Sequence, residues 1–489
     1  MTFAELSSEE GLQRIGADRA EDAVTGLAVH SSEAGAGSVF FCIPGEKRDG
    51  HCYAPEAYEN GCRLFVSARP VDLPSDAGVY IAENVRKTLA LLSARFFGYP
   101  AKKLCLIAIT GTKGKTTTAH MIRKLLEEDG VPCAYIGSDG FIAGERHEPL
   151  QNTTPDSLTL NRYFSLLLYM GIRTAVMEVS SQALSSFRVY GICFPICVFT
   201  NLYRDHIGRG EHRSFREYRE AKLSLFRDYG CELAVVNTAS PVYGRIAAEG
   251  CVGRLIGFRY GKGADYTAGK AVAFRKDREL MTSFWVHHHT ESGQACLPLA
   301  GKHYVENFTA ALAVVCEMRR KPIGEYLHHA EKMKIPGRCE VVPLSLPGLY
   351  VLDYAHNGAG LRAALLGLRP YVTGRLWCLF GAVGGHAECR RADMARAACK
   401  YADFSVITED NPDDENLLEI CRCIYRAFPD KSRVCMIPDR AEAIRYIAAR
   451  VTDGDVVLLA GKGNETYQLR EGKRVHFSEK EVLAGLMTD

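Results

Sequence analysis

The segment Leu106-Ile-Ala-Ile-Thr-Gly-Thr-Lys-Gly-Lys-Thr-Thr-Thr118 decides the class of fold. Its apolar run predicts a buried strand, its glycines predict a tight turn, and the residues from Lys115 onward predict a helix. Gly111 and Gly114 allow backbone N–H groups to surround a phosphate, and the helix N-terminus adds positive potential. Lys115 can then reach the outer phosphates, and the Thr116 hydroxyl can bind Mg²⁺. The segment therefore predicts a nucleotide phosphate site.

A strict phosphate-loop motif has a glycine where this chain has Ile109, so the surrounding pattern must support the assignment. Short Val, Ile and Leu runs alternate with longer helical patterns along most of the chain. Such alternation predicts an α/β fold with parallel sheets and crossover helices. The expected strands are 38–43, 63–67, 104–109, 174–179, 196–200, 233–237, 349–354, 376–380, 404–408 and 455–460.

The length of 489 residues exceeds one domain, since domains usually hold about 100–200 residues. Composition changes near residues 99–100 and 336–337 predict domains at 1–98, 99–335 and 336–489. The 60 basic residues nearly balance the 58 acidic ones, which argues against a nucleic-acid partner. With no secretory start and no run near the ~18 apolar residues of a membrane span, we expect a cytoplasmic protein without membrane insertion.

The 18 cysteines are scattered through apolar segments of a long chain, which favours reduced thiols over disulfides or a zinc site. The triplet His287 to His289 follows a strand-like run. Alternation along a strand would send neighbouring histidines to opposite faces, so we expect a solvated strand rather than a metal site.

Polar residues follow two of the expected strands. Glu178 and Ser180 come at the end of one strand, and Asp205 and His206 follow another. Because open α/β sheets bind ligands at the carboxyl ends of their strands, these residues are expected in one crevice, with Glu178 as a candidate Mg²⁺ ligand. Considered alone, His206 would be an ordinary histidine and Lys222 a solvated charge.

These segments, in this order, resemble the Mur ligases, which form amide bonds with ATP in peptidoglycan synthesis. The resemblance is strongest to the branch that adds the third amino acid to UDP-N-acetylmuramoyl-L-alanyl-D-glutamate through an acyl phosphate. It implies a UDP-substrate domain, a central domain with a P-loop ATPase-type parallel sheet, and a Rossmann-like C-terminal domain that binds the amino acid, in a monomer. The matching motifs include Asn152-Thr-Thr-Pro155, Glu178-Val-Ser-Ser181, Ala221-Lys-Leu-Ser-Leu-Phe226, Asp353-Tyr-Ala-His356, Asp410-Asn-Pro412 and Ala460-Gly-Lys-Gly463.

The resemblance also implies roles for individual residues. Catalysis is assigned to Lys115, Lys222, Glu178 and His206. ATP contacts are assigned to Gly111, Thr112, Lys113, Gly114, Lys115, Thr116, Thr117, Asn307, Arg338 and Asp353. Two Mg²⁺ ions are assigned to Thr116, Glu178, His206 and a carbamylated Lys222. The UDP-N-acetylmuramoyl-dipeptide is assigned to Ser31, Asn152, Thr153, Thr154, Ser180 and Arg188, and the amino acid to Arg391, Asp410, Asn411, Asp413, Gly461 and Glu465.

Some positions depart from the family pattern. His30-Ser31-Ser32 stands where relatives usually have Asp-Ser-Arg, Gln182 replaces a usual His, and Tyr304 replaces a usual Asn. The ATP and Mg²⁺ residues are better kept than the sugar-nucleotide residues. A divergent member with another acceptor and a weakly catalytic nucleotide-binding regulator therefore stay open as alternatives, as does a ligase of the folylpolyglutamate or cyanophycin type.

The residues after Asn411 and Pro412 bear on the choice of amino acid. Relatives that select diaminopimelate usually have Arg next, whereas this chain has Asp413 and Asp414. Carboxylates there would repel a distal carboxylate, which favours L-lysine or ornithine over meso-diaminopimelate, although Arg390 and Arg391 lie nearby in sequence. The alternative is that the two acids simply open the next helix.

Overall fold

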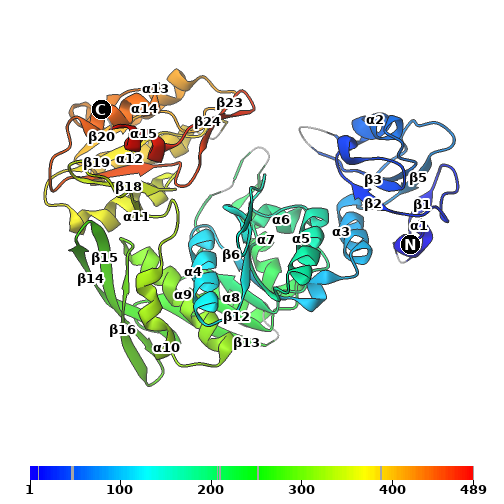
Figure 1. Ribbon diagram of the computed structural model, residues 1–489, viewed down its shortest axis with the longest axis horizontal. Helices are drawn as coiled ribbons and strands as arrows, with labels where there is room; N and C mark the ends of the chain where they lie inside the picture. The colour runs from blue at the N-terminus through cyan, green and yellow to red at the C-terminus, as the bar shows by residue number, and fades with distance from the viewer. Residues whose placement is uncertain are drawn as a thin grey trace. The chain divides into compact units, whose positions relative to one another are not determined.

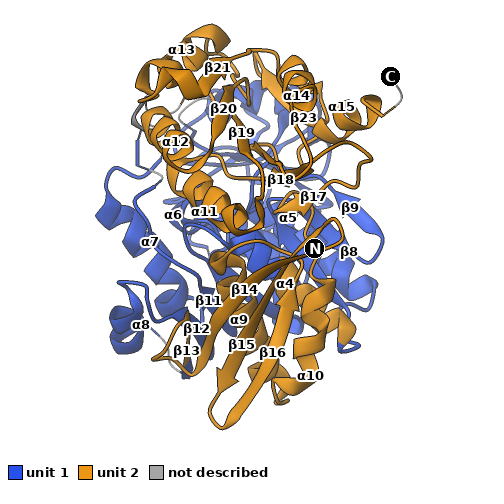
Figure 2. Cartoon of the chain, turned by 90° about the vertical axis from the view of Figure 1, so that its left-hand side faces the viewer, with its two compact units in different colours: residues 1–119, 129–255 blue, residues 120–128, 256–489 orange. Residues whose placement is uncertain are grey.

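The computed structural model describes residues 1–8, 10–45, 49–205, 207–208, 211–250, 253–385 and 388–487, with the side chains of residues 388 and 389 left aside. The chain forms two compact units, coloured separately in Figure 2. Unit 1 holds residues 1–119 and 129–255, and unit 2 holds residues 120–128 and 256–489. The domain boundaries expected after residues 98 and 335 stay predictions.

The first sheet of unit 1 has the strand order β1-β5-β4-β3-β2. Strands β2 to β5 pair in parallel and β1 is antiparallel to β5. One core contains side chains of α1 and α3, and a second core contains side chains of α2, so these strands are buried on both faces (Figure 1). The elements are α1 (Phe3–Ser7), β1 (Gln13–Arg14), β2 (Gly26–Ala28), β3 (Ser38–Cys42), α2 (Ala54–Glu59), β4 (Leu64–Ser67), β5 (Gly78–Ile81) and α3 (Val85–Phe96).

The second sheet of unit 1 has the order β12-β11-β6-β10-β7-β8-β9, parallel from β12 to β7 and antiparallel at β8 and β9. Glu178 pairs in register with Ile109, and Phe199 with Thr110, so the carboxyl ends of β10, β6 and β11 share one edge. The elements are β6 (Cys105–Thr110), α4 (Lys115–Glu128), β7 (Cys133–Gly137), β8 (Gly140–Ala143), β9 (Arg146–Glu148), α5 (Ser157–Tyr169), β10 (Thr174–Glu178), α6 (Ser181–Ser185), β11 (Ile196–Phe199), α7 (Phe215–Asp228), β12 (Leu233–Asn237) and α8 (Tyr243–Glu249). Residues 120–128 of α4 belong to unit 2.

Unit 2 begins with a β-ribbon packed on a long helix. Strand β14 pairs in parallel with β13 and antiparallel with β15, which pairs antiparallel with β16. His287 is exposed, as expected for a solvated strand, whereas His288 is half-buried and stacks on the Tyr266 ring. Within the described part of the chain, no cluster of metal-binding side chains forms there or elsewhere. The elements are β13 (Arg254–Tyr260), β14 (Tyr266–Lys276), β15 (Glu279–His288), β16 (Glu291–Leu297), α9 (Lys302–Arg319) and α10 (Gly324–Leu327).

The last sheet of unit 2 has the order β17-β18-β22-β19-β20-β21, all parallel except β17. Side chains of α14 and α15 share a core with these strands, whereas α11, α12 and α13 contact the strands outside that core. The elements are β17 (Glu340–Val341), β18 (Leu349–Asp353), α11 (Gly358–Leu368), β19 (Leu376–Phe380), α12 (Glu388–Tyr401), β20 (Phe404–Ile407), α13 (Leu417–Ala427), β21 (Val434–Met436), α14 (Arg440–Ala448), β22 (Val456–Ala460), the hairpin β23 (Tyr467–Arg470) and β24 (Lys473–His476), and α15 (Glu479–Gly485).

A fully buried arginine ties this sheet to the last helix. Arg440, at the start of α14, donates to the carboxylate of Glu479 on α15 at 2.9 Å. The same guanidinium donates to the backbone carbonyls of Glu409 and Ala460, both at 2.8 Å, at the ends of β20 and β22. Arg440 thus joins helix α15 to the backbone that follows β20 and to the last residue of β22. The sheets described above confirm the predicted α/β fold with parallel sheets.

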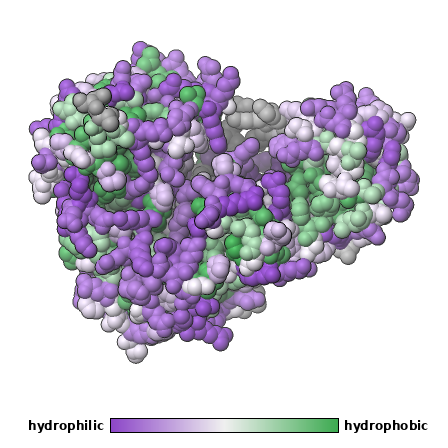
Figure 3. Space-filling view, viewed as in Figure 1, coloured by the Kyte–Doolittle hydropathy of each residue, from purple (hydrophilic) through white to green (hydrophobic). Residues whose placement is uncertain are grey.

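Hydrophilic residues cover most of the face seen in Figure 3, between smaller apolar areas. Among the described residues, no helix is both long and apolar enough to span a bilayer. The 16 described cysteines are all free, as the sequence predicts.

Candidate active site

The turn between β6 and α4 forms a tight loop at the carboxyl edge of the unit 1 sheet. Gly111 has φ +143°, and a Cβ there would lie 2.0 Å from the Thr200 hydroxyl, so only glycine fits. Gly114 has φ +84° just before the helix begins. The two glycines expected to shape a phosphate loop therefore have the backbone conformations that such a loop requires.

Residues that follow β11 hold this loop from the side. The Asn201 side chain accepts from the Lys113 N–H at 2.8 Å and donates to the Lys113 carbonyl at 3.0 Å. The Thr200 hydroxyl donates to the same carbonyl at 2.6 Å, and the Lys113 ammonium forms an ion pair with Asp205 at 3.3 Å. The loop is thus preorganised by contacts across the sheet rather than by its own sequence alone.

Two lysines converge on one carbonyl of the loop. Lys115 Nζ donates to Gly111 O at 3.1 Å, and Lys222 Nζ donates to the same oxygen at 2.9 Å. Lys222 comes from α7 and is 2% exposed. Burial lowers the pKa of Lys222 well below its ordinary value, and the nearby charge of Lys115 lowers it further. Lys222 is therefore not the solvated charge that its sequence context alone would suggest.

Glu178 lies at the end of β10 and is 1% exposed. Its Oε1 accepts from the Tyr135 hydroxyl at 2.5 Å and from the Ser138 N–H at 3.1 Å. Tyr135 was not predicted, although a polar phenol inside the fully buried strand β7 is a signal that could have revealed it. A buried carboxylate oriented by two donors, together with the Thr116 hydroxyl on α4, provides the oxygen ligands that Mg²⁺ prefers.

The predicted sugar-nucleotide residues of unit 1 join the same network. Thr154 donates its hydroxyl to the Glu178 carbonyl at 3.0 Å and accepts from the Ser180 N–H at 3.0 Å. Arg188 donates to the Thr154 carbonyl at 2.8 Å. Burial lowers the pKa of Arg188, and the charge of Arg86 lowers it further, so two desolvated guanidinium groups lie near each other. Arg86 was not predicted, and such a pair suits an anionic ligand.

Other predicted residues of unit 1 have different surroundings. Ser31 donates its hydroxyl to Glu56 at 2.9 Å in the first sheet region. Thr153 shares a hydrogen bond with Ser138 at 3.0 Å, and Asn152 is exposed. His206, expected at the metal site, lies outside the described residues.

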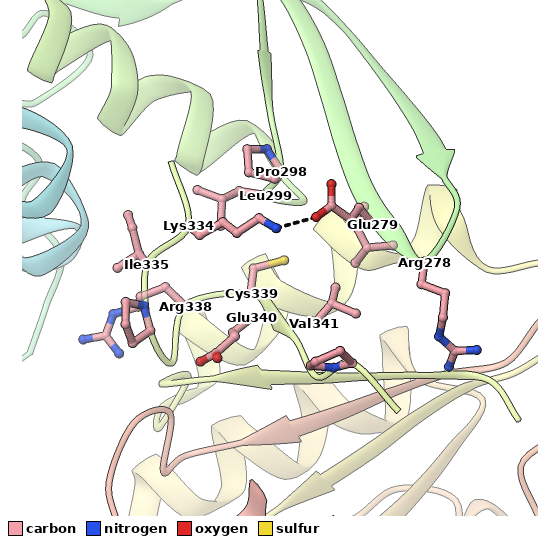
Figure 4. Close-up of a pocket in the computed structure, with 13 residues that line it drawn as sticks. Arg278, Glu279, Pro298, Leu299, Lys334, Ile335, Arg338, Cys339, Glu340 and Val341 are labelled. Atoms are coloured by element: carbon pink, nitrogen blue, oxygen red, sulfur yellow. Dashed lines mark hydrogen bonds and ion pairs between the residues drawn. The ribbon is translucent and has the colours of Figure 1, made fainter. Parts of the chain in front are cut away.

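The three residues of unit 2 assigned to ATP lie on three segments. Asn307 is on α9, Arg338 is on the linker before β17 (residues 333–339), and Asp353 is at the end of β18. Arg338 packs over the Tyr354 ring, with 4.5 Å between the guanidinium carbon and the ring centroid. A pocket of about 370 Å³ lies beside this linker, and Figure 4 shows Arg338, Cys339 and Glu340 along it. The linker thus presents Arg338 next to a solvent-accessible hollow.

Three of the residues assigned to the amino acid lie around a lysine that was not assigned a role. Lys462 Nζ lies 3.0 Å from the Asn411 side-chain oxygen, 3.0 Å from Glu465 and 3.7 Å from Asp410. Gly461 has φ +114°, and a Cβ there would lie 2.6 Å from Asp410. Burial raises the pKa of Asp410, and the charge of Lys462 opposes that rise. Lys462 therefore compensates the buried carboxylate of Asp410 and the partly buried carboxylate of Glu465.

The helix interpretation of Asp413 and Asp414 is wrong. Helix α13 starts at Leu417 with Asn416 as its N-cap, after these two acids. Asp413 instead has φ +53° and accepts from the Gly472 N–H at 2.9 Å, which ties its loop to the β23–β24 hairpin. Asp414 is exposed.

Arg391, also assigned to the amino acid, is already paired within the chain. Its guanidinium lies 2.6 Å from the Glu415 carboxylate, and its side chain is 5% exposed. Glu415 also accepts from the Gly385 N–H at 2.9 Å. Arg391 is thus fixed against the loop that follows Pro412.

The fold and the loop define a nucleotide-binding α/β protein of the phosphate-loop class. Family models match three successive stretches: "Mur ligase family, catalytic domain" over residues 23–96, "Mur ligase middle domain" over 109–315, and "Mur ligase, glutamate ligase domain" over 337–463. The chain belongs to the Mur ligase family. The predicted family is confirmed, and with it an ATP-dependent ligase of peptidoglycan synthesis.

Similar proteins span the whole chain. The "UDP-N-acetylmuramoyl-L-alanyl-D-glutamate--2,6-diaminopimelate ligase" of Syntrophomonas wolfei is 35% identical over 472 residues, covering 95% of this chain and 94% of the relative. The relative of the same name from Aquifex aeolicus is 35% identical over 470 residues, covering 94% of each. A solved structure of a protein with that name has a TM-score of 0.69 at 27% identity, covering 100% of this chain and 99% of the other.

Proposed function

We propose that this chain adds a diamino acid to UDP-N-acetylmuramoyl-L-alanyl-D-glutamate, with ATP as the energy source. The observation that carries the proposal is the contact of Thr154 with Glu178 and Ser180. It connects a residue assigned to the sugar nucleotide with a residue assigned to Mg²⁺. The relatives at 35% identity, named for that same acceptor, support this substrate.

The reaction follows from the chemistry of a carboxylate, which is a poor electrophile. ATP transfers its γ-phosphoryl group to the terminal carboxylate of the acceptor, which gives an acyl phosphate. The amine of the incoming amino acid then attacks the carbonyl carbon, and inorganic phosphate leaves. In the proposal, Lys115 neutralises charge on the phosphoryl group in transit, and Arg188 binds the anionic acceptor.

Thr116 and Glu178 would hold one Mg²⁺, which supplies charge neutralisation at the phosphates when bound. We also propose that Lys222 is carbamylated and, with His206, holds a second ion. The buried position and lowered pKa of Lys222 support this, since only a neutral amine adds CO₂. A carbamate would place an anionic oxygen ligand where the unmodified side chain has a neutral amine next to Lys115.

Two diamino acids have separate support. Relatives are named for diaminopimelate, which favours that substrate. The acids Asp413 and Asp414, which follow Pro412, favour L-lysine because they would repel a distal carboxylate. The proposed use of ATP and a UDP-sugar supports a cytoplasmic location for this reaction.

The test is phosphate release from the full chain with ATP, Mg²⁺ and UDP-N-acetylmuramoyl-L-alanyl-D-glutamate. L-lysine, L-ornithine and meso-diaminopimelate are compared, and the product mass is measured. Release that requires both acceptor and amino acid, with the mass of one added residue, supports the proposal and names the amino acid. Nucleotide binding without coupled release would favour a divergent acceptor or a regulatory role.

A further inference from the structure

Two segments of unit 2 meet at the carboxylate of Asp353. Tyr304, in the first turn of α9, donates its hydroxyl to Asp353 Oδ2 at 2.6 Å. The Cys339 N–H of the linker donates to the same oxygen at 2.9 Å. Because α9 precedes the linker and β18 follows it, the Tyr304 bond connects the two sides of the linker.

The bond is buried and uses a charged acceptor. Tyr304 is 3% exposed and Asp353 is 8% exposed. Burial raises the pKa of Tyr304 well above its ordinary value, and the charge of Asp353 raises it further, so the phenol keeps its proton. A hydrogen bond from a neutral donor to a buried carboxylate is among the stronger single contacts in a protein.

Both hydrogen bonds end on Oδ2, and within the described residues no donor reaches Oδ1. A carboxylate accepts hydrogen bonds and repels phosphate oxygens, so a nucleotide can meet Asp353 only through its ribose hydroxyls or its base amine. An asparagine side chain at position 304 would be shorter than tyrosine by several atoms and would have no hydroxyl to donate to Asp353. The contact with Asp353 is thus a property of this chain's own residue.

We propose that Tyr304 is a positioning residue for nucleotide binding: it holds Asp353 Oδ2 so that Oδ1 faces the hydroxyl or amine donors of the nucleotide. This inference rests on the proposed contact of Asp353 with ATP. It assigns Tyr304 no contact with substrate. The competing explanation is that Tyr304 only packs α9 against the buried core and has no influence on nucleotide binding.

The experiment measures Mg·ADP affinity by calorimetry on the full chain for the wild type, Tyr304→Phe and Tyr350→Phe. Tyr350 lies on β18 and is 1% exposed, and among the described residues its hydroxyl has no hydrogen-bond partner, so its variant deletes the same atom without touching Asp353. We expect Tyr304→Phe to weaken ADP binding about tenfold, as expected for loss of a hydrogen bond to a charged group. Tyr350→Phe should bind ADP like the wild type.

Pyrophosphate separates positioning from general damage, because it has neither ribose nor base. Its affinity should be equal in the wild type and in Tyr304→Phe, and equality also shows that the variant is folded. If Tyr304→Phe does not fold, Tyr304→Met deletes the same donor and is measured in the same way. In turnover assays the variant should raise KM for ATP about tenfold and leave kcat within about twofold.

A double-mutant cycle with Asp353→Asn completes the test. In that background, Tyr304→Phe should cause no further loss of ADP affinity, since both changes remove one interaction. Wild-type ADP affinity in Tyr304→Phe, a matching loss for pyrophosphate, or full additivity with Asp353→Asn would overturn the proposal. A chain that binds ADP but shows no ligase turnover would count against the proposed function and leave this inference standing.

Discussion

Two lysines of this chain are buried to nearly the same degree and have opposite surroundings. Lys222 is 2% exposed and Lys462 is 0% exposed. Lys222 bonds a backbone carbonyl and lies near other lysines, whereas Lys462 is surrounded by Asp410, Asn411 and Glu465. The difference teaches that burial alone does not define a role: the first environment favours a neutral, reactive amine, and the second surrounds the side-chain nitrogen with acceptor oxygens.

The largest expected effect is on turnover. Lys222→Ala removes the proposed carbamate and should lower kcat about a thousandfold or more, a loss of about 4 kcal/mol in transition-state stabilisation. Mg·ADP affinity should stay near the wild-type value, because Lys115 and the loop glycines are unchanged. Phosphate release and calorimetry check the two quantities. Normal turnover in this variant would refute the carbamate assignment.

Lys462→Met tests the other half of the comparison. Removing the Lys462 cation leaves the buried Asp410 and the partly buried Glu465 without their partner, which should cost about 3–5 kcal/mol of unfolding free energy. Denaturant unfolding measures that cost, and KM for the amino acid should rise with it. Lys334→Met is the matched control, because Lys334 is 70% exposed and its ion pair with Glu279 should contribute under about 1 kcal/mol. Equal losses of unfolding free energy in Lys462→Met and Lys334→Met would show that the surroundings of Lys462 do not distinguish it from an exposed lysine.

The two lysines also differ in how pH acts on stability. The folded-state pKa of Lys222 is lowered, so the unfolded chain binds an extra proton between that value and the ordinary lysine pKa. Stability from this residue therefore rises with pH, by up to about 1.4 kcal/mol per pH unit. We expect Lys222→Met to have a higher unfolding free energy than the wild type at pH 7 in bicarbonate-free buffer. This difference in unfolding free energy should shrink between pH 7 and pH 10. A constant difference would show that Lys222 is charged in the folded state.

A smaller effect is expected where Tyr135 orients Glu178. Tyr135→Phe removes the hydroxyl that donates to the carboxylate at 2.5 Å and should raise the Mg²⁺ concentration needed for half-maximal turnover about tenfold. Magnesium titration of phosphate release measures it. Tyr163→Phe is the control, since Tyr163 is also buried and donates to Glu148 at 2.9 Å. A Mg²⁺ requirement unchanged from the wild type would remove Tyr135 from the site.

The smallest effect concerns the choice of diamino acid. Asp414 is exposed, so Asp414→Asn should raise kcat/KM for meso-diaminopimelate relative to L-lysine by only about threefold. Asp453→Asn, at another exposed acid of unit 2, should leave the ratio unchanged. Competition between the two amino acids, read out by product mass, gives the ratio directly. A shift toward L-lysine would contradict the repulsion argument.

The expected strands could be read from sequence because each is a compact apolar run. Every expected strand is present with each end within about one residue; 233–237, for example, is β12 (Leu233–Asn237) without change. The phosphate loop was also predictable, since its glycines, lysine and threonine are adjacent in the chain. Local patterns therefore gave the fold class and the anchor of the site.

Contacts between distant positions could not be predicted in that way. Tyr135 meets Glu178 across 43 residues, Tyr304 meets Asp353 across 49, and Lys462 meets Asn411 across 51. Each depends on which helices, strands and loops become neighbours in the fold, which no local pattern states. Asp413 shows the same limit, because its partner is the backbone of Gly472 in a later hairpin.

The buried guanidinium of Arg440 has a consequence for how the end of this chain can vary. Its partner Glu479 lies on α15, and the carbonyls it binds end the two strands that lead into Asp410 and Gly461. A chain shortened before α15 would keep every residue assigned to the amino acid. It would nevertheless leave the buried Arg440 without its carboxylate partner Glu479. Fusions placed after α15, in contrast, keep the Arg440–Glu479 pair.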